Sequence, residues 1–399
     1  MVEIISFWRK DTDTSTIMTR MHSYYKKVLI MKKRVLNQYH FFFMLVFFIS
    51  VNVHSEDEMH SQTDMKESHM EHLLHKASHH APVGIMGGEY HKKGEFMFSI
   101  NRKRVSMKDN SSNGKQLSDY EIISLPNPYN IGAMPSKLSV VPENMDVNMT
   151  MFGGMYGVSD RYTLMVMAMY VEKKMNMNTY SAMANRSFLG SFRSQTSDLS
   201  NFSLSSLIKI KETQAYKLHA EIGLEKSIGD SDKQGEVLNP MNMKMNIRFP
   251  YSMQTGDKST SLISAMTFVK KNVGWGYGSQ IRHKQAINKK EWNFGNSLTV
   301  NIWVSKDISD QLSWSLRGTF IDQAPIEGRD IIIMAPVQTS NPANYGGQTY
   351  EIALGMNRLI SFGNGNRIGL ELVIPVKQNL NGPQMERSHS INLTYQKSF

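Results

Sequence analysis

The feature that most constrains the fold is an alternation of apolar and polar residues that recurs from Glu95 to the end of the chain. Between Arg367 and Val376, for example, an apolar side chain occupies every even position. Successive side chains of a β-strand point to opposite faces, so this period predicts strands with one apolar and one polar face. About twelve such segments can be counted, at residues 94–104, 145–156, 161–175, 200–211, 216–226, 259–270, 273–284, 296–306, 311–322, 348–360, 366–377 and 389–399.

The lengths of these segments and of the links between them favour a closed barrel in a membrane. About ten residues suffice for a tilted strand to cross a bilayer, and tight links such as 157–160 alternate with long ones such as 105–144. Only closure of the sheet satisfies every strand edge in lipid. We therefore predict an all-β fold, a closed antiparallel up-and-down transmembrane β-barrel of about 12 strands over residues 94–399, with Phe399 completing a C-terminal assembly signal. A soluble β-sandwich or lipocalin-like barrel is the alternative, because it would show the same alternation.

The first 55 residues have the pattern of an export signal. Residues 31–34 are cationic, residues 41–51 form an apolar run, and residues 53–55 offer a cleavage site. The run is about half as long as a membrane-spanning helix, so we predict a signal peptide over residues 31–55 after an upstream start extension, residues 1–30. Half of the formal net charge of +10 lies in this region, and nucleic-acid binding by the rest is therefore disfavoured. The absence of cysteine excludes disulfides, thiolate zinc sites and a cysteine nucleophile.

The predicted mature chain begins with a polar leader, residues 56–93, that is rich in histidine and methionine. As a helix it would carry Met65 and four histidines on one stripe, and imidazole and thioether groups bind transition metals. The interpretation as a copper or zinc site rests on His69, His72, His75, His79 and His80. The alternative is a soluble spacer that hangs in the periplasm or plugs the barrel lumen. No cofactor is expected to be required.

If apolar side chains face lipid, the other face of each strand lines the lumen. Charges there would select solutes, or would pair with one another and hold the wall together. We expect Met145, Met149 and Met151 to face lipid, whereas inward thioethers could bind a soft metal ion, contact an apolar solute or fill space. The candidate lumen residues are Arg161, Met165, Met167, Met169, Lys209, Lys217, His219, Glu221, Arg282, Arg317, Arg367 and Glu371.

Motifs spread from residue 80 to the C-terminus carry a family resemblance. They are HAPVGIMG at 80–87, HKKGEFM at 91–97, VPENM at 141–145, LMVM at 164–167, YVEK at 170–173, APVQT at 335–339, NYGG at 344–347 and NLNGPQME at 379–386. With these motifs the chain resembles a family of uncharacterised Gram-negative outer-membrane "transporter" proteins related to the phenol-degradation-pathway (MetA-type) β-barrels. The resemblance implies an outer-membrane barrel that passes aromatic compounds or metals, and it transfers no catalytic or ligand residues.

These observations together predict an exported channel or transporter for a small solute, a transition-metal ion or an aromatic compound, and not an enzyme. Outer-membrane lipids, lipopolysaccharide and the barrel assembly machinery are the expected partners. A periplasmic metal-binding or sensing protein anchored by its barrel is one alternative. An outer-membrane phospholipase-like enzyme is another, and it would need a lipid-facing histidine beside a serine.

Overall fold

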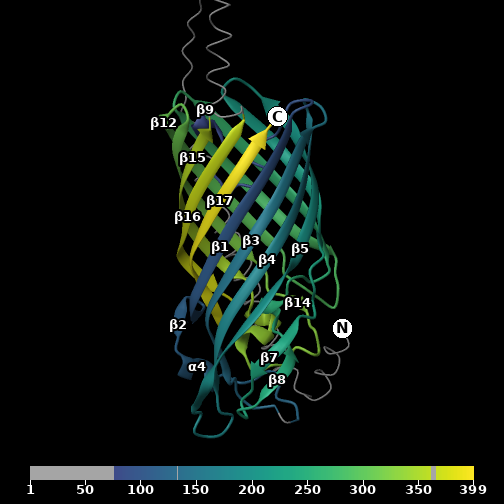
Figure 1. Cartoon of the computed structure of the whole chain (residues 1–399), viewed down its shortest axis with the longest axis vertical. Helices are drawn as coiled ribbons and strands as arrows, with labels where there is room; N and C mark the ends of the chain where they lie inside the picture. The colour runs from purple at the N-terminus through teal and green to yellow at the C-terminus, as the bar shows by residue number, and fades with distance from the viewer. Residues whose placement is uncertain (1–75, 133, 361–364) are drawn as a thin grey trace, which may run out of the picture. The chain divides into compact units, whose positions relative to one another are not determined.

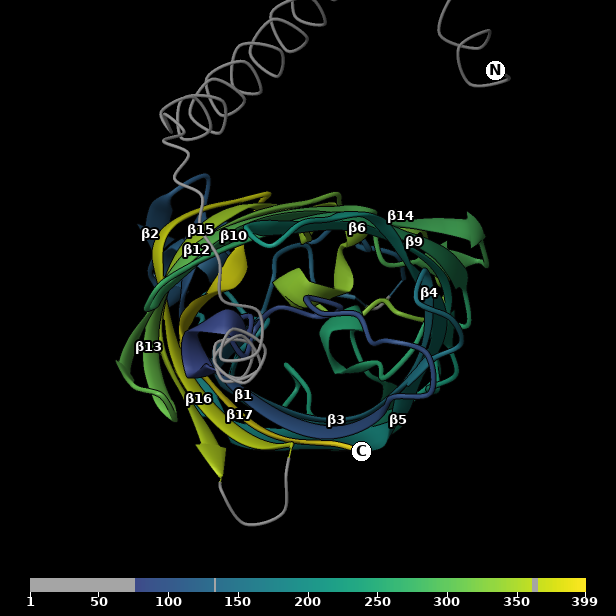
Figure 2. The same cartoon turned by 90° about the horizontal axis from the view of Figure 1, so that it is seen from above.

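The protein was analysed as a computed structural model that describes residues 76–132, 134–360 and 365–399. Its main sheet has 13 strands, of which β2 pairs with β1 alone. The other strands pair antiparallel with their neighbours in chain order, and β17 returns to pair with β1, so that the sheet closes on itself (Figures 1 and 2). A closed antiparallel barrel of twelve strands confirms the predicted fold class. The barrel strands are β1 (Phe96–Ser112), β3 (Val140–Gly157), β4 (Tyr162–Tyr180), β5 (Phe188–Glu212), β6 (Tyr216–Ser227), β9 (Thr260–Asn272), β10 (Trp275–Asn288), β12 (Ser297–Ser309), β13 (Leu312–Gln323), β15 (Gly347–Ile360), β16 (Asn366–Leu380) and β17 (Gln384–Ser398).

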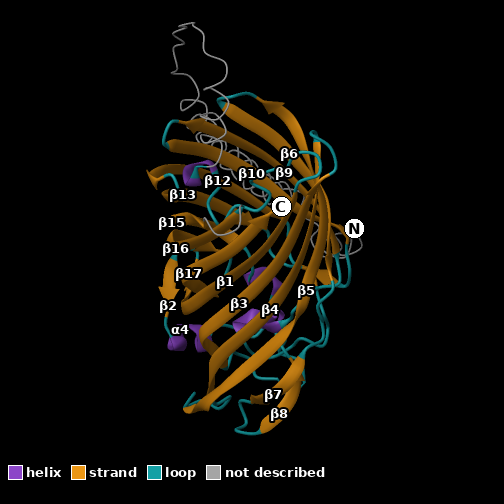
Figure 3. Ribbon diagram, turned by 45° about the horizontal axis from the view of Figure 1, so that its top comes forward, coloured by secondary structure: helices purple, strands orange, loops and turns teal. Residues whose placement is uncertain are grey.

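Most of the smaller elements lie at one end of the barrel, whereas the 3-10 turn over Ala77–His79 lies at the other end, beside the link between β12 and β13 (Figure 3). The helix α4 (Asp119–Ser124) starts with a capping box in which Ser118 and Glu121 satisfy each other's backbone N–H groups. Two short ladders lie in long loops, and four single 3-10 turns complete the described structure. These elements are β2 (Lys115–Leu117), β7 (Gln234–Leu238), β8 (Lys244–Arg248), β11 (Trp292–Asn293), β14 (Glu327–Gly328), η1 (Ala77–His79), η2 (Tyr251–Met253), η3 (Gln338–Ser340) and η4 (Pro342–Asn344).

Burial in the barrel is inverted relative to a soluble domain. On β16, the apolar side chains of Leu370 and Ile374 are each 50% exposed, whereas the carboxylate residue Glu371 is fully buried. The exposed face of the barrel is therefore apolar and the interior face polar, as in barrels that contact lipid. No helix in the described ranges is long and apolar enough to span a membrane.

The apolar belt on the outside has a defined height. On β4 it runs from Tyr162 to Tyr170, both 44% exposed, with only apolar side chains between them on that face. Eight residues of strand correspond to about 26 Å, and aromatic residues at both margins are typical of membrane interfaces. Beyond Tyr170 the same face carries Glu172, Lys174 and Asn176. The strands thus continue past the belt, which is why several of them are longer than predicted.

The two ends of the barrel differ, and we name them by their connections. The turn end carries the tight links, such as residues 213–215, together with the end of β17. The loop end carries residues 113–139, 228–259 and 324–346, which include α4, β7 and β8 (Figure 1).

One prediction about side-chain direction is wrong. Met145, Met149 and Met151 face the lumen, because their direct partners on β4 are the inward-facing Met175, Val171 and Met169. Near the loop end the strands project beyond the belt, so their outer face is polar. Their inner face is apolar instead, and it packs against loop residues such as Phe249, Met253 and Val337.

Candidate functional site: a cavity in the barrel lumen

The segment after residue 75 enters the lumen at the turn end and is held there by polar side chains of the barrel wall. Gln280 Nε2 donates to the carbonyl oxygen of Met86 at 2.9 Å, and His219 Nε2 lies 2.8 Å from that of Gly87. Arg367 Nη1 donates to the carbonyl oxygen of Ala81 at 3.1 Å. Since a carbonyl only accepts, His219 carries its proton on Nε2. We call residues 76–93 the lumen segment.

A carboxylate within the lumen segment strengthens this attachment. Glu89 accepts from the backbone N–H of Ala81 at 3.0 Å, and it lies 3.1 Å from His80 Nδ1 and 3.5 Å from Arg367 Nη1. Burial acts to raise the pKa of Glu89, but the charges of His80 and Arg367 outweigh it and hold the pKa well below its ordinary value. An ionised Glu89 therefore holds residues 80 and 81 of the lumen segment close to residue 89, and its contact with Arg367 attaches both to the barrel wall.

Charged residues of the wall pair with one another, in two cases across an intervening strand. Arg317 donates from Nε and Nη2 to the two carboxylate oxygens of Glu371, at 2.9 and 2.7 Å. Arg282 forms an ion pair with the buried Glu221. Near the turn end, Lys209 and Lys217 both pair with Glu212, at 3.2 and 2.8 Å. These contacts follow the expectation that lumen charges brace a narrow barrel.

The loop end is filled by two long loops that fold back into the barrel. Tyr251 is fully buried, and its ring meets the ring of Trp292 edge-on with centroids 4.9 Å apart. Arg248 binds Asp330 at 2.7 Å and so joins the two loops. Residues 251–255 are fixed to the wall through their carbonyl oxygens, which accept from Thr196 and Ser200 at 2.8 and 2.7 Å.

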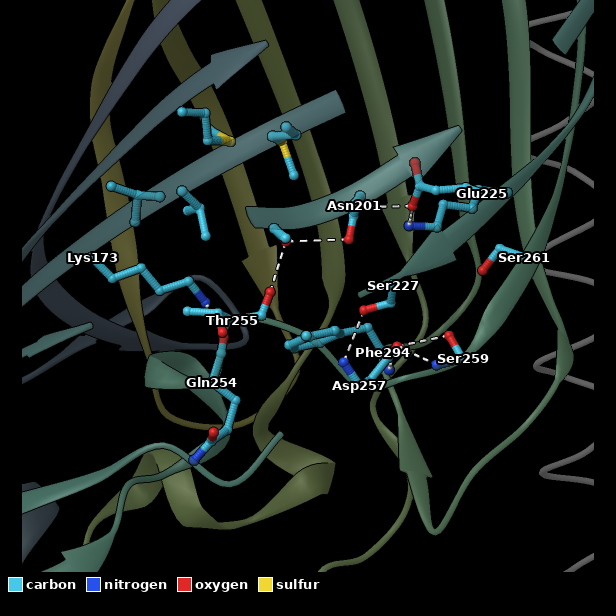
Figure 4. Close-up of a pocket in the computed structure, with 17 residues that line it drawn as sticks. Lys173, Asn201, Glu225, Ser227, Gln254, Thr255, Asp257, Ser259, Ser261 and Phe294 are labelled. Atoms are coloured by element: carbon cyan, nitrogen blue, oxygen red, sulfur yellow. Dashed lines mark hydrogen bonds and ion pairs between the residues drawn. The ribbon is translucent and has the colours of Figure 1, made fainter. Parts of the chain in front are cut away.

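Between the lumen segment and these loops lies a cavity of about 230 Å³ (Figure 4). One side of it is apolar and the other side is polar. The apolar lining residues are Val147, Met149, Met169, Val171 and Phe294, and the charged ones are Lys173, Glu225, Asp257 and Lys284. Lys284 and Glu225 form an ion pair, and Asn201 donates to Glu225 at 3.1 Å. The carboxylate of Asp257 accepts hydrogen bonds from the backbone N–H groups of Ser259 and Phe294, both at 2.9 Å.

A second cavity, of about 150 Å³, borders the first. It shares Val147 and Met149 with the larger one and is otherwise lined in part by Lys103, Glu351 and Arg387. Glu351 is paired with Arg387 at 3.0 Å. The lumen thus contains an apolar patch with polar groups on both sides of it.

The predicted site residues are spread over several parts of the structure. Most of the charged ones and His219 line the turn-end half of the lumen, around the lumen segment. Met169 lines the larger cavity, whereas Met165 is buried against Met97, Met155 and Leu207, and Met167 packs on that cluster. Arg161 was predicted in the lumen, and this is wrong, because it lies exposed in the turn before β4 with its guanidinium 5.9 Å from the ring of Tyr162.

The predicted metal ligands are only partly described. His69, His72 and His75 lie outside the described residues. His79 is half-buried in η1, where partial burial together with the charge of Lys271 lowers its pKa to about 4. His80 faces Glu89. Among residues 76–132, 134–360 and 365–399, no three histidine or acidic side chains come together in a way that could hold a metal ion.

No local pattern in the sequence singles out several of the cavity residues. Lys103 and Lys173 stand in short basic runs, at 102–104 and 173–174, and nothing there distinguishes them from cations that form ion pairs, such as Lys284. The loop residues 249–257 could have been suspected, since Phe249, Tyr251 and Met253 are apolar residues in a loop that would otherwise meet water. Their destination inside the barrel depends on the tertiary fold.

No protein-family profile matches this sequence, and no curated protein matches it. Among solved structures, the chain is similar to an outer membrane channel from Pseudomonas putida F1, with 12% identity over 79% of this chain and 99% of that chain and a TM-score of 0.51. Lower similarities, with TM-scores of 0.39, link it to the translocator domain of the autotransporter NalP from Neisseria meningitidis (10% identity, 84% and 95% coverage) and to the toluene transporter TodX from P. putida (11% identity, 77% and 91% coverage). The first of these similarities shows a shared fold: the chain forms a closed β-barrel like that of a solved outer membrane channel.

Proposed function

We propose that this protein is a channel of a Gram-negative outer membrane that admits a small, largely apolar solute such as an aromatic compound. The observation that carries the proposal is the lumen cavity of about 230 Å³, part of whose wall is formed by methionine and valine side chains. An apolar cavity of about 150 Å³ accommodates benzene, so the larger cavity has the size for a substituted aromatic ring. Thioethers contact aromatic rings favourably.

The outer surface supports the membrane location. An apolar belt with tyrosines at both margins suits a bilayer, and lipopolysaccharide would contact the polar strand extensions beyond the belt at the loop end. The C-terminal strand presents Ile391, Leu393, Tyr395 and finally Phe399, a pattern that the barrel assembly machinery would recognise.

Passage of a solute requires two parts of the chain to move: the lumen segment at the turn end and the loops that fold into the barrel at the loop end. Some of the bonds that attach the lumen segment join its backbone carbonyls to neutral side chains of the wall, such as Gln280, and such bonds contribute about 1 kcal/mol each. Arg367 adds charged contacts with Ala81 and Glu89. These contacts are separate from the hydrogen-bond ladders of the strands, so displacement of the lumen segment is compatible with an intact barrel. A transition-metal solute has less support, since the described histidines contact Glu89, Gly87 and other protein groups singly. His219 does not fit the enzyme hypothesis, because its side chain faces the lumen and is buried against Gly87.

A flux measurement tests the proposal. The purified protein would be reconstituted into vesicles whose outer leaflet contains lipopolysaccharide, and influx of radiolabelled toluene and arabinose would be followed. We expect toluene to enter faster than in protein-free vesicles, with a much smaller gain for the sugar. Equal toluene influx with and without protein would reject the proposal.

A further inference from the structure

Two lysines in the lumen differ from the other cations around them. Lys284 and Arg317 are each paired with a glutamate. Lys173 and Lys103 also point into the lumen, where each lines one of the two cavities. Among the described residues, however, neither of these two lysines forms an ion pair. Holding an ammonium away from bulk water without a counter-ion is costly, and such a group attracts an anion.

The register of the strands places these lysines on opposite sides of one apolar patch. Lys103 of β1 lies directly opposite Met149 of β3, and Met149 lies opposite Val171 of β4. In the next inward-facing row, Val105 lies opposite Val147, and Val147 lies opposite Lys173. The four apolar residues of these two rows, Val105, Val147, Met149 and Val171, form a patch. Each row therefore contributes one lysine, at opposite edges of the patch.

Lys173 has a structural role that uses only part of its capacity. Its ammonium donates to the carbonyl oxygens of Ser252 and Gln254, at 2.9 and 2.6 Å, and so helps to hold the loop that bounds the cavity. Figure 4 shows Lys173 beside Gln254. An ammonium has three donors, so one remains for the cavity. Two neutral carbonyls also leave its charge uncompensated. Lys103 makes no side-chain hydrogen bond to the described residues, and Glu351 beside it is already bound by Arg387.

The shape of the lumen restricts what could bind there. About 230 Å³ accommodates one aromatic ring with a small substituent. A ring on Met149 and Val147 would place a substituent at the edge of the patch, where the lysines lie. A carboxylate is the substituent that neutralises an ammonium and accepts its free N–H group.

We propose that Lys103 and Lys173 are two anion-binding positions in the lumen, which receive the carboxylate of a monoaromatic acid while its ring lies on Met149 and Val147. This inference rests on the proposed channel function and names the chemical class of its solute. Two positions on either side of one apolar patch allow the carboxylate to pass from one lysine to the other while the ring keeps its contacts.

Equilibrium binding tests the inference separately from transport. Titration calorimetry of the folded protein in detergent would compare benzoate with benzyl alcohol, a neutral molecule of similar size. We expect benzoate to bind at least about tenfold more tightly, since hydrogen bonds to charged groups are the stronger ones. Equal affinity for the two compounds in the unmodified protein would overturn the proposal, and this comparison requires no variant.

Substitutions then assign the binding to the two lysines. K173M and K103M should each weaken benzoate binding about tenfold, and K173R should retain most of the benzoate affinity. K103M should leave benzyl alcohol binding nearly unchanged, because Lys103 makes no side-chain hydrogen bond to the described residues. K174M is the matched control, because Lys174 is the next residue of the same strand but pairs with Glu172 on the outer face. Wild-type benzoate affinity in folded K173M and K103M would overturn the assignment. Lysine-dependent benzoate binding without flux of any aromatic compound would refute the channel and leave this inference standing.

Discussion

Arg317 and Glu371 form a two-pronged ion pair inside the barrel, with N–O distances of 2.9 and 2.7 Å, and the backbone of Gly84 lies directly against it. The pair joins β13 to β16 across the intervening β15, and Asn392 of β17 donates to the same carboxylate at 2.8 Å. The pair thus links three strands of the wall, β13, β16 and β17, to the lumen segment.

Removal of this carboxylate should weaken the barrel. Glu371 is fully buried, so E371Q leaves the Arg317 charge without its counter-ion, and such a loss costs about 3–5 kcal/mol. Urea unfolding of the detergent-solubilised protein, followed by tryptophan fluorescence, measures the change. E236Q serves as control, since Glu236 and Lys244 form a pair on the exposed surface and should contribute nothing measurable. Identical midpoints for E371Q and the unmodified protein would show that the pair is not needed.

A side chain at Gly84 should dislodge the lumen segment. A Cβ atom there would lie 2.4 Å from Nη2 of Arg317 and 2.6 Å from Oε2 of Glu371, and both groups are fixed by their own bonds. We expect G84V to raise the single-channel conductance in planar bilayers. G154A is the control, because a Cβ atom at Gly154 meets no other atom within 4 Å. Unchanged conductance in G84V would mean that the segment adapts without leaving.

The attachment of the lumen segment should depend on pH through Glu89. Its folded-state pKa lies below the ordinary value of 4.5, so its stabilisation is complete above that pH and is lost as the pH falls through the lowered pKa. Conductance should therefore stay constant from neutral pH down to about 5 and rise only under more acidic conditions. E89Q should show the higher conductance already at neutral pH and lack the acid-induced rise. An acid-induced rise that persists in E89Q would assign the response to another group.

The apolar belt predicts where a charge is tolerated. Leu372 is 43% exposed in the middle of the outward-facing row of β16, and L372R should destabilise the barrel in a bilayer by about 2–4 kcal/mol. Ser197 is exposed on β5 beyond the belt, so S197R should have little effect. Folding into lipid vesicles, scored by the gel mobility of unheated samples, distinguishes the two. If both variants fold equally well, the apolar face does not contact lipid.

The period of two by itself determined the strands, because on a strand the direction of a side chain follows from its position alone. It identified all twelve barrel strands, and their ends at the turn end fall within three residues of the predictions. The same rule failed for Met145, Met149 and Met151. Which face is apolar depends on whether lipid or water surrounds that part of the strand. The sequence alone does not show where along each strand the membrane begins and ends.

Only the tertiary structure decided what fills the barrel. The lumen segment lies in sequence far from the residues that bind it, so that Ala81 meets Arg367 and Gly87 meets His219 only after the sheet has closed. The contrast between the paired Arg317 and the unpaired Lys173 has the same origin. Both are cations on the lumen-facing phase of a strand, and the difference between them is set by which carboxylates the closed barrel and the folded-back loops bring within reach.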